Sequence, residues 1–261
     1  MNRFSDLFPK PNPVIAMIHL PPLPDYQGSP GIGAAIESAI TDLKILEQYS
    51  VDGVLIENEY DRPHRVKASA DTIKAMTEIT AAVVAARSKC VVGCEILLND
   101  PKASLDVAKA AGAEFIRTDY FVDKMSRPEF GEFEIDPEGL INYRKSIDGE
   151  DILIMADIQV KYATMLEERS LKQSAELATY HQADAIVVSG DATGDAPVTI
   201  DLDHAKSGAG VPVIIGSGLD ANNACELMTH CDGAIIGTAL MKNQIVNSEN
   251  VSQLMSALGR N

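Results

Sequence analysis

Two strand-to-loop transitions in the C-terminal quarter of the chain constrain its fold most. Apolar runs at 213–215 and 234–236 each lead into a loop of small residues, as expected where a buried strand ends before a helix. Glycine lets a ligand approach the backbone closely, and free N–H groups at the start of a helix attract anions. We therefore predict a phosphate-binding site, and the residues expected to form it are Gly216, Ser217, Gly218, Gly237 and Thr238.

The position of this pair predicts a (β/α)8 TIM barrel, because such barrels commonly bind phosphate in the loops after strands 7 and 8. Six further apolar runs precede it, each followed by a loop and a helical pattern. These runs are 14–24, 53–57, 90–97, 113–121, 151–161 and 184–190. The strand-to-helix connections are long and polar, which places function on the C-terminal face of the barrel. We expect a single TIM-barrel domain over residues 1–261, with residues 1–12 as an N-terminal cap segment.

Composition excludes several classes of protein. The formal net charge is −16, and the 22 Lys and Arg residues form no basic stripe, which argues against a nucleic-acid partner. No stretch reaches the roughly 20 apolar residues of a transmembrane helix, and the N-terminus lacks the apolar core of a signal peptide. We expect a cytoplasmic protein without a transmembrane segment, and leave a homo-oligomer open. The four cysteines form no CxxC pair, so we expect reduced core thiols rather than a zinc site.

Ionisable or polar residues close nearly every predicted strand. A charge inside the mouth of a barrel is costly unless it is paired, so such a ring is more often functional than accidental. The residues predicted to be catalytic are His19, Glu57, Glu95, Asp119, Asp157 and Lys161. The residues predicted to bind substrate are Arg117, Ser189 and Asp191.

Several of these residues have alternative roles. Arg117 and Asp119 lie two apart on one strand, so a structural ion pair with a neighbour is as good an explanation as a substrate contact. Lys161 has the strand parity of Asp157 if the extended backbone continues, and it is a candidate Schiff-base nucleophile, an anion anchor or a partner that neutralises Asp157. His19 could be a hydrogen-bonded histidine without a chemical role.

The carboxylates could also gather a hard cation. Mg²⁺ prefers one or two carboxylates together with substrate phosphate and water, which makes it the candidate cofactor, although the sequence does not establish that a metal is needed. Neither an HxH nor an HExxH pattern occurs, so a zinc hydrolase is disfavoured.

Several longer segments resemble one known family. They are AMIHLPPLP at 16–24, GVLIENEYDRP at 53–63, CEILLNDP at 94–101, FIRTDYF at 115–121, ADIQVKYA at 156–163, VVSGDATG at 187–194, and the later GSGL and GTALMK motifs. Together they cover nearly the whole chain and are similar to the BtpA/SgcQ family. The resemblance implies a TIM barrel like those of the ribulose-phosphate-binding superfamily. One branch of the family is linked to photosystem I assembly or stability, and another is found beside sugar-uptake genes.

Two functions are therefore considered. The first is a lyase, isomerase or transferase that acts on a small phosphorylated molecule, such as a sugar phosphate or a nucleotide-derived phosphate. The alternative is a non-catalytic assembly or stability factor of the BtpA type. The ring of ionisable residues favours the enzyme, because a scaffold does not need it. The sequence also shows no long amphipathic insertion or basic face for membrane binding.

Overall fold

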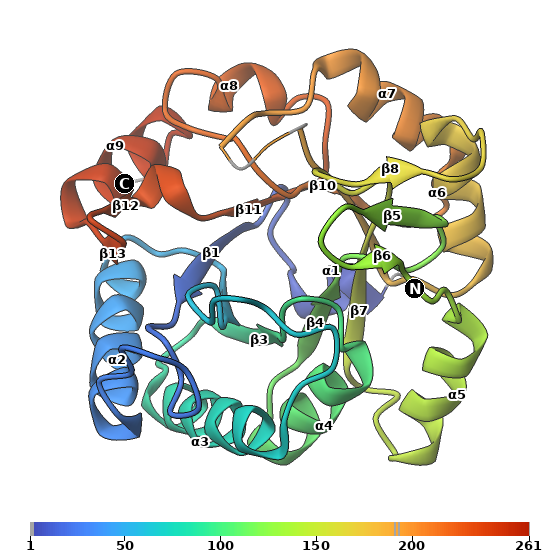
Figure 1. Cartoon of the computed structure of the whole chain (residues 1–261). Helices are drawn as coiled ribbons and strands as arrows, with labels where there is room; N and C mark the ends of the chain where they lie inside the picture. The colour runs from blue at the N-terminus through green and yellow to red at the C-terminus, as the bar shows by residue number, and fades with distance from the viewer. Residues whose placement is uncertain (1–2, 191, 193, 261) are drawn as a thin grey trace.

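The computed structural model describes residues 3–190, 192 and 194–260, and it forms a closed barrel of eight parallel strands (Figure 1). The predicted barrel and its count of eight strands are confirmed. Going round the barrel, the strands are β1 (Val14–His19), β11 (Ala234–Ile236), β10 (Val213–Ile215), β9 (Ala185–Val188), β7 (Leu153–Asp157), β4 (Phe115–Thr118), β3 (Val91–Glu95) and β2 (Gly53–Glu57).

Helices surround the strands, and most connect one strand to the next (Figure 1). The helices are α1 (Arg3–Leu7), α2 (Ile32–Gln48), α3 (Ala70–Ala86), α4 (Pro101–Ala111), α5 (Pro137–Ser146), α6 (Leu171–Tyr180), α7 (Thr199–Gly208), α8 (Ala224–Leu227) and α9 (Ser248–Ala257), with a 3-10 turn η1 (Thr238–Leu240). Local sequence fixes several helix starts. The Asp100 and Asp136 side chains accept backbone N–H groups and precede Pro101 and Pro137, and Ser170 forms a capping box with Gln173.

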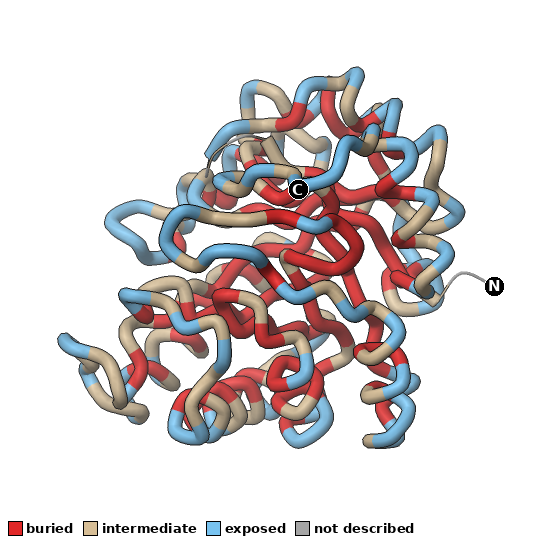
Figure 2. The backbone as a smooth tube through the Cα atoms, turned by 45° about the vertical axis from the view of Figure 1, so that its right-hand side comes forward, coloured by how far each residue is buried: buried red, intermediate tan, exposed pale blue. Residues whose placement is uncertain are grey.

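Side chains alternate between the barrel interior and the layer beneath the helices. On β1, Ile15 and Met17 point inward, whereas Ile18 packs in the outer layer. Both layers are buried, which Figure 2 shows as a buried centre surrounded by exposed outer loops. Side chains that point into the barrel continue to the last residues of the strands. In the parallel register His19 is aligned with Glu57, and Glu57 with Glu95. The strand pattern thus brings these side chains to one mouth of the barrel.

Helix α1 closes the opposite, N-terminal mouth. Phe4 and Phe8 are buried there, with ring centroids 4.9 Å apart, and the Phe8 ring lies 6.0 Å from that of Phe115. Gly93 makes room for Phe115, since a Cβ at Gly93 would lie 2.3 Å from its ring. The Arg3–Asp184 ion pair, at 2.7 Å, holds α1 in place.

Small hairpins add strands that the sequence did not predict. A three-stranded sheet of β6 (Gly131–Glu132), β5 (Met125–Arg127) and β8 (Thr164–Met165) lies at the C-terminal mouth, within two of the long strand-to-helix connections. β12 (Met241–Lys242) and β13 (Ile245–Val246) form a second hairpin. Strands of two or three residues are too short to give a periodic pattern.

Two further expectations need correction. β7 ends at Asp157 rather than at 161, because the chain turns at Gln159, which has a φ of 47°. Cys90, Cys94 and Cys231 are buried free thiols as expected, but Cys225 is exposed on α8. Within the described residues, every helix is too short or too polar to cross a membrane.

Candidate active site at the carboxyl ends of the strands

Three neighbouring strands end in His19, Glu57 and Glu95, which are side by side in register. Their side chains are only 9%, 9% and 3% exposed. His19 Nε2 lies 3.4 Å from Glu57 Oε2, and Glu57 is within hydrogen-bonding reach of Glu95. Within the described residues, the buried Glu95 Oε2 has no hydrogen-bond partner. A proton shared between the two glutamates would satisfy this oxygen.

A buried ion pair lies next to them. Arg117 donates to both oxygens of Asp157, from Nε at 2.7 Å and from Nη2 at 2.8 Å, and the side chains are 7% and 2% exposed. Arg117 Nε is also 3.9 Å from Glu95 Oε2, and Ser189 Oγ donates to Asp157 Oδ1 at 3.5 Å. The structural alternative considered for Arg117 is therefore present, and its hydrogen-bonded partner is Asp157. We infer that Asp157 positions the guanidinium.

Burial dominates the electrostatics of the other ring residues. It raises the pKa of Glu95 well above its usual range and also raises the pKa of Glu57, with Arg117 opposing both shifts. Burial, followed by the charge of Asp157, raises the pKa of Asp119 to about 6. Burial lowers the pKa of His19 to about 4, so this imidazole is neutral at pH 7. The mouth therefore combines a buried ion pair with two glutamates whose pKa values are raised by burial and with a neutral histidine.

Lys161 lies in the turn after β7. The extended backbone assumed for it in the sequence analysis is absent, but its charge still acts on His19, Glu57 and Asp119. Among the described residues, no carboxylate lies within ion-pair distance of its ammonium group. Its charge therefore acts on the ring from the turn after β7, and no described carboxylate forms an ion pair with it.

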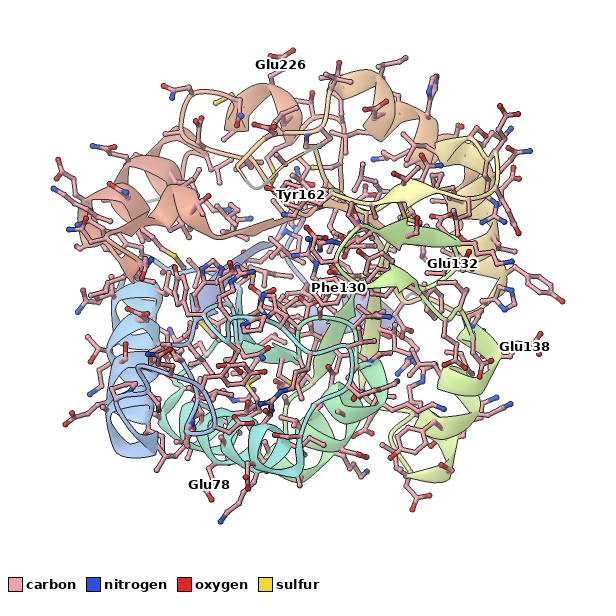
Figure 3. The ribbon with its side chains drawn as sticks, in the orientation of Figure 1. Glu78, Phe130, Glu132, Glu138, Tyr162 and Glu226 are labelled. Carbon is pink, nitrogen blue, oxygen red and sulfur yellow. The ribbon has the colours of Figure 1, made fainter. Side chains whose placement is uncertain are left out.

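Part of the mouth is covered by a lid, defined here as β5, β6 and β8 with the residues between β5 and β6. The Tyr120 and Phe133 rings stack at 3.7 Å beneath this lid. In Figure 3 Phe130 lies near the barrel centre and Tyr162 nearer to β10, and the Arg127 guanidinium carbon is 5.7 Å and 5.6 Å from the centroids of these two rings.

The described residues form no dedicated metal cage, and Mg²⁺, which needs only one or two carboxylates together with substrate phosphate, stays a candidate cofactor. No group of three or more His, Cys, Asp or Glu side chains in the described part of the chain is arranged to hold a metal ion. Arg117 already supplies a positive charge to Glu95 and Asp157. We therefore assign no step to Mg²⁺.

Glycines, rather than charged side chains, follow the last residues of β10 and β11 at this mouth of the barrel. A Cβ at Gly216 would lie 2.5 Å from Ser189 Oγ and 3.0 Å from Arg117 Nη2. A Cβ at Gly237 would lie 3.3 Å from His19 Nε2. Both glycines therefore leave space that neighbouring ring side chains occupy, and they connect the ring to the predicted phosphate loops.

The two loops beyond these glycines differ in what they offer a ligand. Ser217 Oγ donates to Asp195 O at 2.9 Å and accepts from Gly190 N at 3.3 Å, so its hydroxyl is used within the protein. A Cβ at Gly218, whose φ is 74°, would lie 2.0 Å from Ala196 N. No described residue accepts a hydrogen bond from the N–H groups of Gly218, Thr238 or Ala239. These N–H groups are the candidate anion donors.

A pocket of about 370 Å³ adjoins these donors. Its lining includes Gly218, Thr238 and Ala239. Of the other predicted residues, Asp191 lies outside the described part of the chain, so its predicted role in substrate binding stays a prediction.

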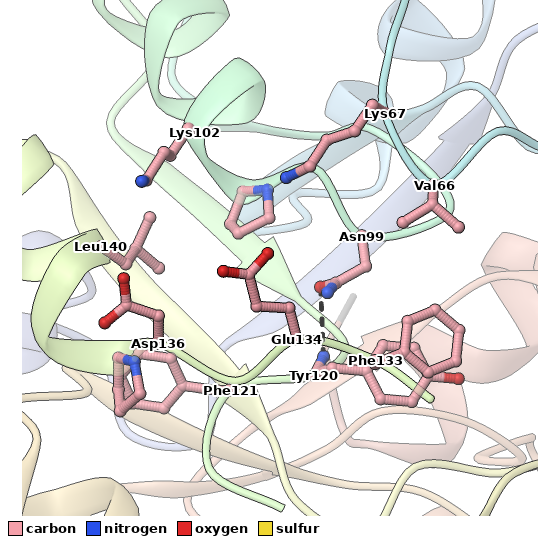
Figure 4. Close-up of a pocket in the computed structure, with 12 residues that line it drawn as sticks. Val66, Lys67, Asn99, Lys102, Tyr120, Phe121, Phe133, Glu134, Asp136 and Leu140 are labelled. Atoms are coloured by element: carbon pink, nitrogen blue, oxygen red, sulfur yellow. Dashed lines mark hydrogen bonds between the residues drawn. The ribbon is translucent and has the colours of Figure 1, made fainter. Parts of the chain in front are cut away.

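A second cavity, of about 100 Å³, lies on another side of the stacked Tyr120 and Phe133 (Figure 4). Lys67 and Lys102 lie opposite Glu134 in this view, and Tyr120 N donates to Asn99 Oδ1 at 3.3 Å. Its lining contains none of the predicted site residues. We therefore treat it as separate from the ring.

Two residues near His19 escaped the sequence analysis. Burial raises the pKa of Glu59, whose charge in turn acts on His19, and the Tyr60 ring meets the His19 ring edge-on at 6.0 Å. Both follow β2 directly, so the signal was their position next to Glu57. The prediction of ionisable site residues followed the strand ends, and Glu59 and Tyr60 lie in the loop after β2.

The fold and this mouth define an α/β TIM barrel with a candidate site at the carboxyl ends of its strands. The chain belongs to the BtpA family, which it matches over residues 10–260. An uncharacterised protein of Archaeoglobus fulgidus is 33% identical over 247 residues, covering 94% of this chain and 97% of that protein. The photosystem I biogenesis protein BtpA of Synechocystis is also 33% identical, covering 95% and 88%.

Solved structures support the fold. Phosphoribosyl anthranilate isomerase of Thermus thermophilus superposes with a TM-score of 0.61 at 12% identity, covering 95% of this chain and 98% of the isomerase. At this identity the likeness shows the fold alone.

Proposed function

We propose that this protein is an enzyme that moves a proton on a small phosphorylated substrate, in a lyase or isomerase reaction at the C-terminal mouth of the barrel. The observation that carries the proposal is the buried ring of His19, Glu57, Glu95, Arg117 and Asp157. Burying ionisable groups costs stability, and groups with shifted pKa values concentrate at functional sites. A scaffold gains nothing from this arrangement.

The carboxyl pair Glu57 and Glu95 supplies the general acid and base. One shared proton makes one glutamate a donor and leaves the other as an acceptor, so the pair can take a proton from a carbon next to a carbonyl and return it elsewhere. Neutral His19, 3.4 Å from Glu57, can pass that proton toward the substrate. Asp119, with a pKa of about 6, is a second candidate base.

The cations stabilise negative charge that develops during the reaction. The charge of Lys161 acts on His19, Glu57 and Asp119, and no described carboxylate forms an ion pair with it, which suits it to bind an oxyanion. A Schiff base at Lys161 remains the alternative. Arg117 is held by Asp157, so we assign Arg117 to fixing the local field and Asp157 to positioning it.

The substrate phosphate binds at the loops after β10 and β11. The N–H groups of Gly218, Thr238 and Ala239 would donate to it, as is common at this place in TIM barrels. A Cβ at Gly216 would meet Arg117 and one at Gly237 would meet His19, so the two loops begin next to the ring, and a substrate whose phosphate binds there would have the ring within reach.

A thermal-shift screen of phosphorylated sugars, with and without Mg²⁺, tests this proposal. A ligand that binds the native state raises the melting temperature by mass action. Hits should lose their effect in Thr238→Glu, which adds a negative charge at an exposed position beside the donors, and keep it in Thr238→Gln. Gly218→Asp is a weaker probe, because its Cβ would collide with the backbone at Ala196. A complete screen without hits, or hits unaffected by Thr238→Glu, would contradict the proposal.

The second candidate is an assembly or stability factor, which the name of the Synechocystis relative favours. The two functions separate experimentally, because a Glu95→Gln variant would remain fully active as an assembly factor.

A further inference from the structure

Three polar side chains at the lid have buried atoms without a hydrogen-bond partner. Within the described residues, these atoms are Tyr120 Oη, Arg127 Nε and His64 Nδ1. They come from three different segments, because Tyr120 follows β4, Arg127 ends β5, and His64 lies in the loop between β2 and α3. A buried polar atom without a partner costs free energy and needs an explanation. All three atoms are therefore candidates for contacts to a ligand.

Aromatic contacts bring these groups together. The Tyr120 ring stacks on Phe133 with centroids 3.7 Å apart, and the Phe133 ring lies 6.3 Å from that of Phe130. The Arg127 guanidinium carbon is in turn 5.7 Å from the Phe130 centroid. The charge of Arg127 acts on both the Tyr120 hydroxyl and the His64 ring. We refer to Tyr120, Arg127 and His64 as the Arg127 cluster.

The Arg127 cluster lies at the same mouth as the buried ring. Tyr120 is only 4% exposed, and the charges of Asp119 and Asp157 act on its hydroxyl. Phe130, which packs against Arg127, lies near the barrel centre in Figure 3. A group bound at the cluster would therefore belong to a molecule that also reaches the ring.

All three groups of the cluster can donate a hydrogen bond at neutral pH. Arg127 is always protonated, and burial raises the pKa of Tyr120 to about 12, so its hydroxyl keeps its proton. Burial, together with the charges of Arg62 and Arg127, lowers the pKa of His64 to about 4. Its imidazole is therefore neutral and can carry its single N–H at Nδ1. Three donors suit a group that only accepts, such as a carboxylate.

The charge of the cluster favours a group with a single negative charge. In the described part of the chain, the carboxylate within ion-pair distance of Arg127 is that of Glu129, 3.9 Å from Nε on a side chain that is 64% exposed. Such an exposed pair is weak. One guanidinium matches the charge of one carboxylate, whereas a terminal phosphate carries about −1.5 to −2 at pH 7 and would be repelled more by nearby Asp119.

We propose that the Arg127 cluster binds a carboxylate group of the ligand, with Arg127 and the Tyr120 hydroxyl as the main donors and His64 as the third. The inference rests on the proposed function, since it takes the ring to be the place where the ligand reacts. It does not depend on where a phosphate binds. It narrows the substrate class to carboxylic acids.

Calorimetric titration with four small probes at constant ionic strength tests the inference. The probes form two pairs, glycerol with glycerate and glycerol 3-phosphate with 3-phosphoglycerate. In each pair the second molecule has a carboxylate where the first has a hydroxymethyl group. We expect the carboxylate to tighten binding at least about tenfold, a difference of about 1.4 kcal/mol.

Substitutions assign this gain to the cluster. Arg127→Gln should remove the gain and leave the affinity for glycerol 3-phosphate unchanged. Lys124→Gln is the matched control, because it removes the same charge from a lysine directly before β5 whose side chain is 55% exposed. Tyr120→Phe keeps the aromatic ring and should weaken carboxylate binding about threefold or more. Its melting temperature should not fall, because the hydroxyl has no partner among the described residues.

The outcomes separate this inference from the proposed function. The carboxylate site is wrong if glycerate binds no more tightly than glycerol, or if the gain persists in Arg127→Gln. A lower melting temperature of Tyr120→Phe would also contradict it, by showing that the hydroxyl is bonded within the protein. If Arg127→Gln fails to fold, the carboxylate affinity of Tyr120→Phe decides. Glycerol 3-phosphate that does not bind, or binds equally in Thr238→Glu, would contradict the phosphate site alone.

Discussion

The two mouths of this barrel are built on the same strands and the same inward positions, yet they are filled in opposite ways. The N-terminal mouth holds Phe4, Phe8 and Phe115 in an apolar cluster. The C-terminal mouth places buried Glu57 and Glu95 at positions that continue the same inward set. Aromatic packing stabilises the barrel, whereas buried carboxyls cost free energy. The stability of the fold therefore explains the residues of the N-terminal mouth, whereas those of the C-terminal mouth are better explained by a chemical function.

The largest expected effect comes from a substitution in the charged mouth, and it is an effect on turnover. Glu95→Gln keeps the size of the side chain but cannot exchange a proton, so we expect turnover to fall about 1,000-fold, within the usual range for general acid–base groups. Steady-state kinetics on a substrate found in the screen would measure this. Glu78→Gln on the outer face of α3 is the control (Figure 3). A Glu95→Gln enzyme with native turnover would show that the carboxyl pair is not catalytic.

The second largest expected effect comes from a substitution in the apolar mouth, and it is an effect on stability. Phe8 is 4% exposed, and removing its ring in Phe8→Ala should cost about 3–4 kcal/mol of unfolding free energy through the cavity left behind. Turnover per folded molecule should stay unchanged, because the ring residues lie at the other mouth. Denaturant unfolding and kinetics on the same sample check both halves. Loss of turnover in the folded variant would mean that the two mouths are coupled.

The sequence alone predicts part of this difference between the charged and the apolar mouth. Side chains alternate between the two faces of each strand, and all strands of a parallel barrel run in the same direction. The pattern therefore predicts that the side chains of His19, Glu57, Glu95 and Asp157 point into the barrel at the same mouth. What it could not provide was the partner of each charge. Arg117 pairs with Asp157 across a strand boundary, and that choice depends on side-chain geometry rather than on spacing.

The lid and the glycines are two further features whose contacts the sequence alone does not predict. The lid strands are two or three residues long and depend on tertiary contacts such as the Tyr120–Phe133 stack, which leave no periodic signal. The sequence predicted Gly216 and Gly237 as phosphate ligands. The structure adds that the absence of a Cβ also makes room for Arg117, Ser189 and His19.

A smaller effect separates the residues that hold charge in the mouth from those that transfer protons. Asp157→Asn and Lys161→Met should each lower turnover by about 100-fold, or about 2.7 kcal/mol of transition-state stabilisation, while the phosphorylated ligand still binds. Asp157→Asn also leaves the buried Arg117 without its ion pair, so its folding must be checked by circular dichroism. Near-native rates in both variants would move the chemistry to β1, β2 and β3.

The smallest effect measures the cost of the charged mouth directly. Burial raises the pKa of Asp119 from 3.8 to about 6. Because the folded state holds this proton more tightly than the unfolded state, the carboxyl has no cost below pH 3.8 and destabilises the protein increasingly as the pH rises through 6. Asn cannot ionise, so Asp119→Asn should stabilise the protein at pH 8 by about 1–2 kcal/mol, a value reduced from the full shift because Asp119 is partly exposed. The gain should vanish at pH 4, whereas the exposed control Asp151→Asn should show little gain at either pH. Thermal unfolding at both pH values decides the point, and an equal gain at pH 4 and pH 8 would assign the effect to packing rather than to the buried charge.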